Sequence, residues 1–173
     1  MDLTFILGGA RSGKSAYAER LAAISGLPVT YVATARIGDD EFAARVEQHR
    51  ARRPEHWALV ETPVDLADAV RTHAREGRCV LIDCLTLWLA NLLFPLDGTE
   101  ADASPALEAF DTALSRTHGK LIVVSNEIGL GVVPMGSVTR LYVDELGRLN
   151  QRVAAASTRV TMMVAGLPLV LKG

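Results

Sequence analysis

The feature that most constrains this chain is the segment Gly8–Ser15, which reads Gly-Gly-Ala-Arg-Ser-Gly-Lys-Ser. It satisfies the pattern G-x-x-x-x-G-K-[ST], and it stands between an apolar run typical of a strand and an amphipathic stretch typical of a helix. Glycines let backbone N–H groups turn inward around an anion, and the helix N-terminus adds a positive dipole end. We therefore expect a strand, a loop and a helix in which the loop binds the phosphates of a nucleoside triphosphate.

Each residue type in this loop has a physical task. Lys14 is expected to bridge the β- and γ-phosphate oxygens, and Ser15 to bind Mg²⁺ through its hydroxyl. Lysine is scarce here, because only Lys14, Lys120 and Lys172 occur among 18 basic residues, so an incidental lysine in a glycine-rich turn is the weaker reading. The predicted phosphate-binding residues are Gly8, Gly9, Ala10, Arg11, Ser12, Gly13, Lys14 and Ser15.

Short apolar runs alternate with amphipathic stretches along the rest of the chain. Buried strands are predicted at Leu3–Leu7, Val29–Ala33, Cys79–Ile82, Leu121–Val124 and Val160–Val164, with weaker ones at Ala58–Glu61 and Leu169–Leu171. Helices are predicted at Ser15–Ile24, Asp40–Arg53, Val64–Arg75, Leu85–Leu93, Pro105–Arg116 and Val138–Ala156. This alternation indicates an α/β fold: one domain over residues 1–173, with a mostly parallel sheet covered by helices on both faces. The last two strands are expected to form an antiparallel hairpin, and Pro95–Pro105 to form a surface loop.

Composition excludes several classes of protein. A net charge of −2 gives no basic field for nucleic acid. The most apolar stretch, Leu85–Leu96, contains Thr86, Asn91 and Pro95 and is too short to span a membrane. The first residues lack the basic start and apolar length of a signal peptide, so a cytoplasmic location is expected. The only two cysteines, at positions 79 and 84, fit neither a redox pair nor a zinc site and are read as buried thiols.

A second part of a nucleotide site is expected where another strand ends. The apolar run Cys79–Ile82 is followed by Asp83, as in strands whose terminal aspartate orders the Mg²⁺ shell. An apolar strand ending in aspartate is common by itself. Its presence beside a phosphate loop favours Asp83 as a nucleotide and Mg²⁺ contact.

The segment Asp39–Pro54 contains a histidine with two alternative readings. The segment begins acidic and ends basic, as a helix dipole prefers. His49 shares a face with Phe42 and Val46, so a packed structural histidine is the ordinary interpretation. Arginines surround it, however, and they would hold an imidazole neutral and nucleophilic while attracting phosphate oxygens. These arginines are Arg45, Arg50, Arg52 and Arg53.

Motifs along the whole chain resemble one enzyme family. Besides the phosphate loop they are Tyr31–Ala35, Asp40–Glu41, Arg45–Val46, His49–Arg50, Arg53–Pro54, Trp57, Glu61–Thr62, Asp83–Thr86, Asn91–Phe94, Ser125–Gly129, Gly131–Pro134 and Gly147–Gln151. In order and spacing they closely resemble the bifunctional adenosylcobinamide kinase/adenosylcobinamide-phosphate guanylyltransferase family of cobalamin biosynthesis.

This resemblance implies a RecA-like P-loop domain, a homotrimer, and two reactions on a corrinoid. Adenosylcobinamide would be phosphorylated from ATP or GTP, and GMP would then pass from GTP to adenosylcobinamide phosphate through a guanylylated His49. Some relatives carry a second histidine where this chain has Gln48, which leaves His49 as the candidate. The family's further nucleotide contacts would fall on Ala33, Thr34, Ala35, Arg50, Ala51, Arg52, Arg53, Glu61 and Asp83.

The kinase step needs positioning, charge neutralisation and one base for the attacking hydroxyl. Glu127, just beyond the strand Leu121–Val124, is the candidate base, and a loop carboxylate or helix cap is an equally good reading. Two rival functions share the phosphate loop: a kinase for another small alcohol, and a nucleotide-switched interaction module. The histidine among arginines favours the guanylyltransferase, because neither rival needs an imidazole nucleophile.

Overall fold

The structure, a computed structural model, describes residues 2–36, 54–96, 98 and 102–173. The predicted helix Asp40–Arg53, and His49 within it, lie outside the described residues. The strands are β1 (Asp2–Gly8), β2 (Val29–Ala33), β3 (Ala58–Glu61), β4 (Cys79–Asp83), β5 (Lys120–Asn126), β6 (Arg159–Val164) and β7 (Leu167–Lys172). The helices are α1 (Lys14–Ala23), α3 (Leu66–His73), α4 (Leu85–Leu93), α5 (Ser104–Ser115) and α6 (Ser137–Ala156).

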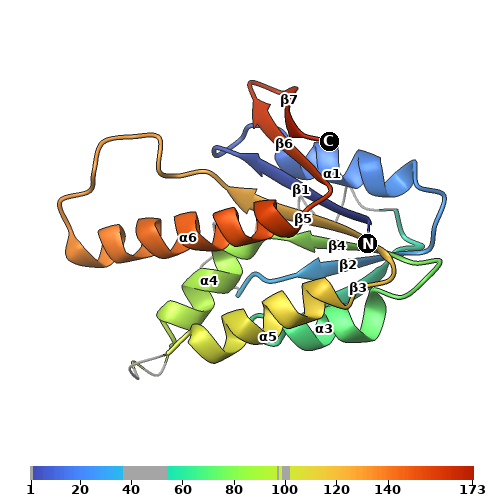
Figure 1. Ribbon diagram of the computed structural model, residues 1–173, viewed down its shortest axis with the longest axis horizontal. Helices are drawn as coiled ribbons and strands as arrows, with labels where there is room; N and C mark the ends of the chain where they lie inside the picture. Colours follow the sequence, from blue (N-terminus) through green and yellow to red (C-terminus); the bar gives the residue numbers. More distant parts are fainter. Residues whose placement is uncertain (1, 37–53, 97, 99–101) are drawn as a thin grey trace.

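The seven strands form one sheet in the order β3-β2-β4-β5-β1-β6-β7, and only β7 runs antiparallel to its neighbour (Figure 1). Strand β1 lies between β5 and β6, although both follow it by more than a hundred residues. The predicted α/β fold, with a mostly parallel sheet and an antiparallel hairpin at its end, is confirmed. The carboxyl ends of the parallel strands meet at one edge, which is where the two halves of the predicted nucleotide site belong.

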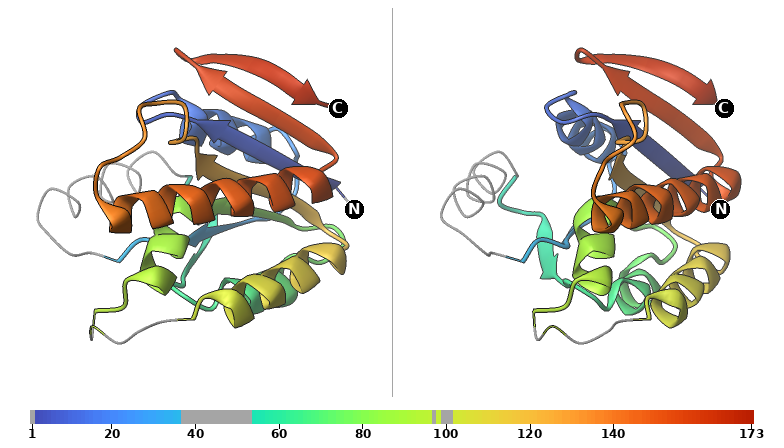
Figure 2. Two further views of the ribbon diagram at one scale, coloured as in Figure 1. Left: turned by 60° about the vertical axis from the view of Figure 1, so that its left-hand side comes forward. Right: turned by 90° about the vertical axis from the view of Figure 1, so that its left-hand side faces the viewer.

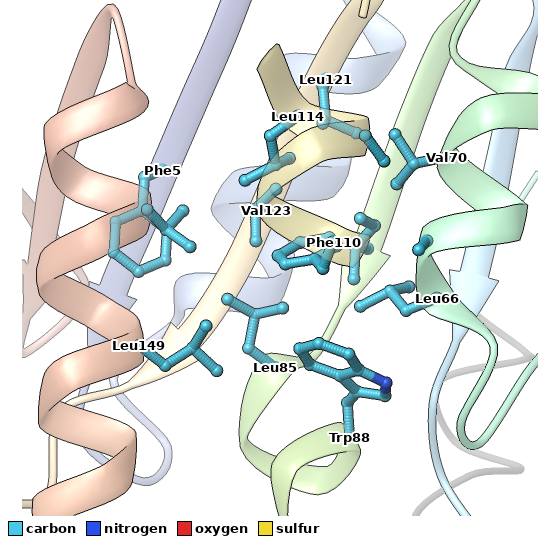
Figure 3. Packing of buried hydrophobic residues seen from close by; sticks show 14 of the residues in the cluster. Phe5, Leu66, Val70, Leu85, Trp88, Phe110, Leu114, Leu121, Val123 and Leu149 are labelled. Carbon is cyan, nitrogen blue, oxygen red and sulfur yellow. The ribbon is translucent and has the colours of Figure 1, made fainter. Parts of the chain in front are cut away.

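Successive side chains of a strand point to opposite faces, so the sheet carries two apolar layers. Phe5 belongs to the layer under α3, α4, α5 and α6, whereas Ile6 packs in the layer under α1. Figure 2 shows the arrangement of these helices around the sheet. The first layer is centred on Trp88 and Phe110, whose ring centroids lie 4.9 Å apart, and it is drawn in Figure 3. Helices therefore cover both faces, and the carboxyl edge is left for the loops.

Most predicted elements appear within one or two residues of their expected ends. Helix α5 begins at Ser104, so the last part of the predicted loop Pro95–Pro105 is helical. Both cysteines are buried free thiols, as predicted, and burial raises the pKa of Cys84 to about 11. In the described parts of the chain, no helix is long and apolar enough to cross a membrane.

Candidate functional site

The sheet register brings residues from five strands to one edge. Gly8 at the end of β1 pairs with Asn126 at the end of β5. Ala33 at the end of β2 pairs with Asp83 on one side and with Glu61 on the other. Five segments that are far apart in the sequence thus converge where the phosphate loop begins, and this edge is the candidate nucleotide site.

The phosphate loop has the backbone conformation that its glycines allow. Gly13 is the N-cap of α1 with φ of 89°, a left-handed conformation that other residues rarely adopt. A Cβ on Gly8 would lie 2.4 Å from the Ser12 side-chain oxygen and 2.9 Å from the Met163 carbonyl oxygen. A side chain at either position would distort the loop, so both glycines are required by the geometry.

Backbone N–H groups from two other segments hold this loop in place. The Glu127 N–H, just beyond β5, donates to the Gly8 carbonyl at 3.1 Å. The Gly166 N–H, in the turn between β6 and β7, donates to the Ser12 carbonyl at 3.1 Å. The loop conformation is therefore fixed from both sides of β1 by backbone contacts.

Lys14 is the first residue of α1, and its side chain lies over the loop. The Lys14 Nζ donates to the Gly9 carbonyl oxygen at 3.0 Å. Burial lowers the pKa of the Lys14 ammonium from its ordinary value, while the negative charge of the nearby Asp83 acts in the opposite direction. The cation and the carboxylate of the two predicted half-sites thus lie close enough to influence each other.

Asp83 is held by a tyrosine to which the sequence analysis assigned no role. The Tyr31 hydroxyl, on the neighbouring strand β2, donates to the Asp83 Oδ2 at 3.0 Å. Tyr31 pairs with Leu81 in the register, so Asp83 lies two residues further along the same face of the sheet. The sequence does hint at such a contact, since the tyrosine hydroxyl at position 31 needs a hydrogen-bond partner near the end of a buried strand. It does not say which strand lies beside Tyr31.

The donor set suits a magnesium ion bound together with a nucleotide. Ser15 supplies a hydroxyl near the start of α1, and Asp83 supplies a carboxylate at the end of β4. Within the described ranges, no group of three or more histidine, cysteine, aspartate or glutamate side chains could hold a metal alone. Magnesium usually binds through one or two protein oxygens while phosphate oxygens and waters complete its shell, so Ser15 and Asp83 fit it.

Glu127, the predicted base, lies directly after β5 next to the phosphate loop, and its carboxylate has a local partner. Its backbone N–H contacts Gly8, and its Oε1 accepts the Gly129 N–H at 2.7 Å. The carboxylate thus orders the start of the loop that leads to α6. The same residue is adjacent to the phosphate loop, so the geometry suits both readings made from the sequence.

A polar network that the sequence analysis did not identify connects α4, β5 and α6 behind the edge. The Thr86 hydroxyl accepts the Asn126 N–H at 2.8 Å, and the Tyr142 hydroxyl donates to the Thr86 carbonyl at 2.7 Å. The Asn150 amide donates to the Asn126 carbonyl at 3.0 Å. These bonds join the end of β5 to α4 and α6.

The other predicted site residues lie at this edge, just beyond a strand, or outside the described residues. Glu61 is exposed at the end of β3, and Ala35 is half-buried two residues beyond β2. The candidate nucleophile and the basic residues that follow it are outside the described residues, so their roles stay predictions. These residues are His49, Arg50, Ala51, Arg52 and Arg53.

Solved structures with the same arrangement of elements support the fold. The flagellar accessory protein FlaH from Methanocaldococcus jannaschii matches with a TM-score of 0.53 and 17% identity, covering 99% of this chain and 78% of that one. The RadB recombinase matches with a TM-score of 0.52 and 16% identity, covering 93% of this chain and 73% of that one. At such low identity these likenesses show the RecA-like P-loop fold alone.

Sequence relatives are far more similar. The bifunctional adenosylcobalamin biosynthesis protein CobP of Pseudomonas aeruginosa is 56% identical over 168 residues, which are 97% of this chain and 96% of that protein. The corresponding CobU protein of Escherichia coli is 37% identical over 98% of this chain and 99% of its own length. Residues 4–171 match the family described as cobinamide kinase/cobinamide phosphate guanyltransferase. The chain, with its phosphate loop and strand-end aspartate at one edge of a RecA-like sheet, belongs to this family of bifunctional enzymes of cobalamin biosynthesis.

Proposed function

We propose that the first reaction phosphorylates adenosylcobinamide with ATP or GTP. The corrinoid hydroxyl oxygen forms a bond to the γ-phosphorus while the bond from that phosphorus to the β-γ bridging oxygen breaks. The products are adenosylcobinamide phosphate and a nucleoside diphosphate, and the hydroxyl proton passes to a base. The convergence of the phosphate loop with Asp83 and the Glu127 backbone at one sheet edge is the observation that carries this proposal.

Four side chains of this edge would serve the kinase step. Lys14 neutralises charge on the β- and γ-phosphate oxygens, since its ammonium already lies over the loop. Glu127 accepts the hydroxyl proton, and its backbone contact with the Gly8 carbonyl, at the start of the phosphate loop, supports this role. Ser15 and Asp83 would hold Mg²⁺, which would supply further charge neutralisation at the phosphates when bound.

The second reaction transfers GMP from GTP to adenosylcobinamide phosphate through His49. An imidazole nitrogen bonds to the α-phosphorus and pyrophosphate leaves, which gives a guanylylated histidine. An oxygen of the corrinoid phosphate then attacks the same phosphorus, and the bond to the imidazole breaks. Adenosylcobinamide-GDP forms and free His49 is restored. Arg50, Arg52 and Arg53 act in the earlier displacement, where they neutralise the pyrophosphate as it leaves.

Labelled GTP distinguishes this function from both rivals. With adenosylcobinamide and γ-labelled GTP, the label should appear on the corrinoid. With α-labelled GTP alone, the label should appear on the protein, and it should move to the corrinoid when adenosylcobinamide phosphate is added. A kinase of another alcohol gives neither corrinoid product, and a nucleotide switch gives only free phosphate. Absence of all three labelled products would overturn the proposal.

We also propose a homotrimer, located in the cytoplasm, as the family resemblance implies. Strand β7 supports an assembly, because its apolar side chains are exposed on an edge of the sheet: Leu167 is 70% exposed, Leu169 53% and Leu171 54%. Sedimentation equilibrium should give three times the 18.6 kDa mass of one chain, and a monomer mass would contradict the trimer. Cell fractionation tests the location.

A further inference from the structure

Two side chains fix the end of β4, one from β2 and one from the residue directly after β2. The first acts on the Asp83 carboxylate. Tyr31 is only 4% exposed, so its ring is packed under α1 with little freedom to move. Its hydroxyl contacts one carboxylate oxygen of Asp83 and leaves the other oxygen unused by this bond. Because a hydrogen bond to a charged group is among the stronger ones, this contact selects one orientation of the carboxylate.

The second side chain acts on the backbone that follows Asp83. Thr34 is fully buried, and its hydroxyl donates to the Cys84 carbonyl at 2.7 Å. The same oxygen accepts the Cys84 N–H at 3.0 Å. One hydroxyl thus binds the peptide groups on both sides of Cys84, which fixes the path of the chain where it leaves the strand.

Asn91 in turn holds Thr34. The Asn91 side-chain nitrogen donates to the Thr34 carbonyl at 2.7 Å and to the Pro63 carbonyl at 3.0 Å. The segment after β2 is therefore tied to α4 and to the segment after β3. A rigid support of this kind is what keeps a ligand side chain within the tolerance that magnesium geometry demands.

We propose that Tyr31 and Thr34 are positioning residues, which hold the Asp83 carboxylate in the orientation that Mg²⁺-nucleotide binding requires. This inference rests on the proposed function, in which Asp83 contacts Mg²⁺. The family resemblance places Thr34 among the nucleotide contacts. In the structure, however, the Thr34 hydroxyl donates one hydrogen bond and accepts another, and both are made with the backbone of Cys84. Its side chain therefore acts on the aspartate segment, and through it on the metal.

The test compares nucleotide affinity with and without magnesium in Tyr31→Phe. Wild-type protein should bind GTP more tightly with Mg²⁺ than with EDTA. We call the dissociation constant in EDTA divided by that in Mg²⁺ the magnesium ratio. Tyr31→Phe keeps the packed ring and loses only the hydroxyl, so the magnesium ratio should fall about tenfold, as for other residues that orient metal ligands. Affinity in EDTA should stay within about twofold, since the phosphate loop is untouched. The titrations use the α,β-methylene analogue of GTP, which cannot guanylylate His49, so calorimetry measures both constants without turnover.

Tyr142→Phe is the matched control. It also removes a tyrosine hydroxyl bonded within the protein, but that hydroxyl contacts the Thr86 carbonyl and not Asp83. Thermal unfolding should show comparable small losses of stability in both variants, whereas the magnesium ratio should change in Tyr31→Phe only. An equal fall of the ratio in both variants would mean a general structural effect and would overturn the positioning role.

Asp83→Asn separates this inference from the function on which it rests. If Asp83→Asn keeps the wild-type magnesium ratio, the metal role of Asp83 is wrong and the positioning role fails with it. If Asp83→Asn loses the ratio while Tyr31→Phe keeps it, only the positioning role is wrong. Thr34→Ser, which keeps the hydroxyl, should retain the wild-type ratio, and Thr34→Val should lower it. A lowered ratio in Thr34→Ser would contradict the part assigned to Thr34.

Discussion

Lys14→Ala is expected to lower both the kinase and the guanylyltransferase rates by about 10³-fold, the size of effect seen when one preorganised charge donor is removed from a transition state. The Lys14 ammonium lies 3.0 Å from the Gly9 carbonyl, over the loop that surrounds the phosphates. No other lysine can replace it, since Lys120 bonds to Asp2 at the opposite end of the strands and Lys172 lies beside the end of α6. Steady-state assays of both reactions measure the effect.

Lys172→Ala is the matched control for this variant. The Lys172 ammonium also donates to backbone carbonyls, those of Ala154 and Ala155, but at an exposed helix end far along the chain from the loop. Both activities should remain within about twofold of wild type, as for most surface substitutions. Lys14→Ala with wild-type turnover and wild-type affinity for GTP would contradict the assignment of the phosphate loop.

His49→Asn is expected to separate the two reactions. Kinase activity with ATP should remain, because phosphorylation of the hydroxyl needs no imidazole nucleophile. Transfer of GMP should fall to background, and the variant should no longer trap α-label from GTP. In the wild type, the trapped label should resist base and be released by acid, as a phosphoramidate is, whereas a serine or threonine ester would survive acid.

His56→Asn provides the comparison for the histidine variant. His56 lies in an exposed turn seven positions after His49, and no role is assigned to it. The His56→Asn protein should be guanylylated as the wild type is. Undiminished labelling of His49→Asn would mean that another residue is the nucleophile. Loss of both reactions in a folded His49→Asn protein would mean that His49 serves substrate binding in both reactions.

The helices and strands were predictable because buried positions appear in the sequence as runs or periodic patterns of apolar residues. The run Leu3–Leu7 predicted β1, which extends one residue further at each end, and Cys79–Ile82 predicted all of β4 except Asp83. The order of the strands could not be predicted in the same way. An apolar run says that a strand is buried on both faces, but it does not say which other strand lies beside it.

The same distinction applies to the site. The phosphate loop and Asp83 were predictable, because glycines, a lysine and a strand-end carboxylate show their chemistry in a local pattern. The Tyr31 contact was not, since its partner lies 52 residues later and becomes a neighbour only through the pairing of β2 with β4. The resemblance gave Thr34 as a nucleotide contact, but the hydrogen bonds of Thr34 and Asn91 were not predictable for the same reason, because they join segments that meet only at the edge of the finished sheet.

The place of β1 in the sheet has a consequence for protein synthesis. Both strands that pair with β1 begin at residue 120 or later, and the contact to the Ser12 carbonyl comes from Gly166. A ribosome makes the N-terminal segment first, so β1 must wait without its sheet partners while most of the chain is translated. The nucleotide loop thus leaves the ribosome before the segments that hold it in shape. A nascent chain that stops before Gly166 would carry the glycines and the lysine of the motif without one of the contacts that shape it.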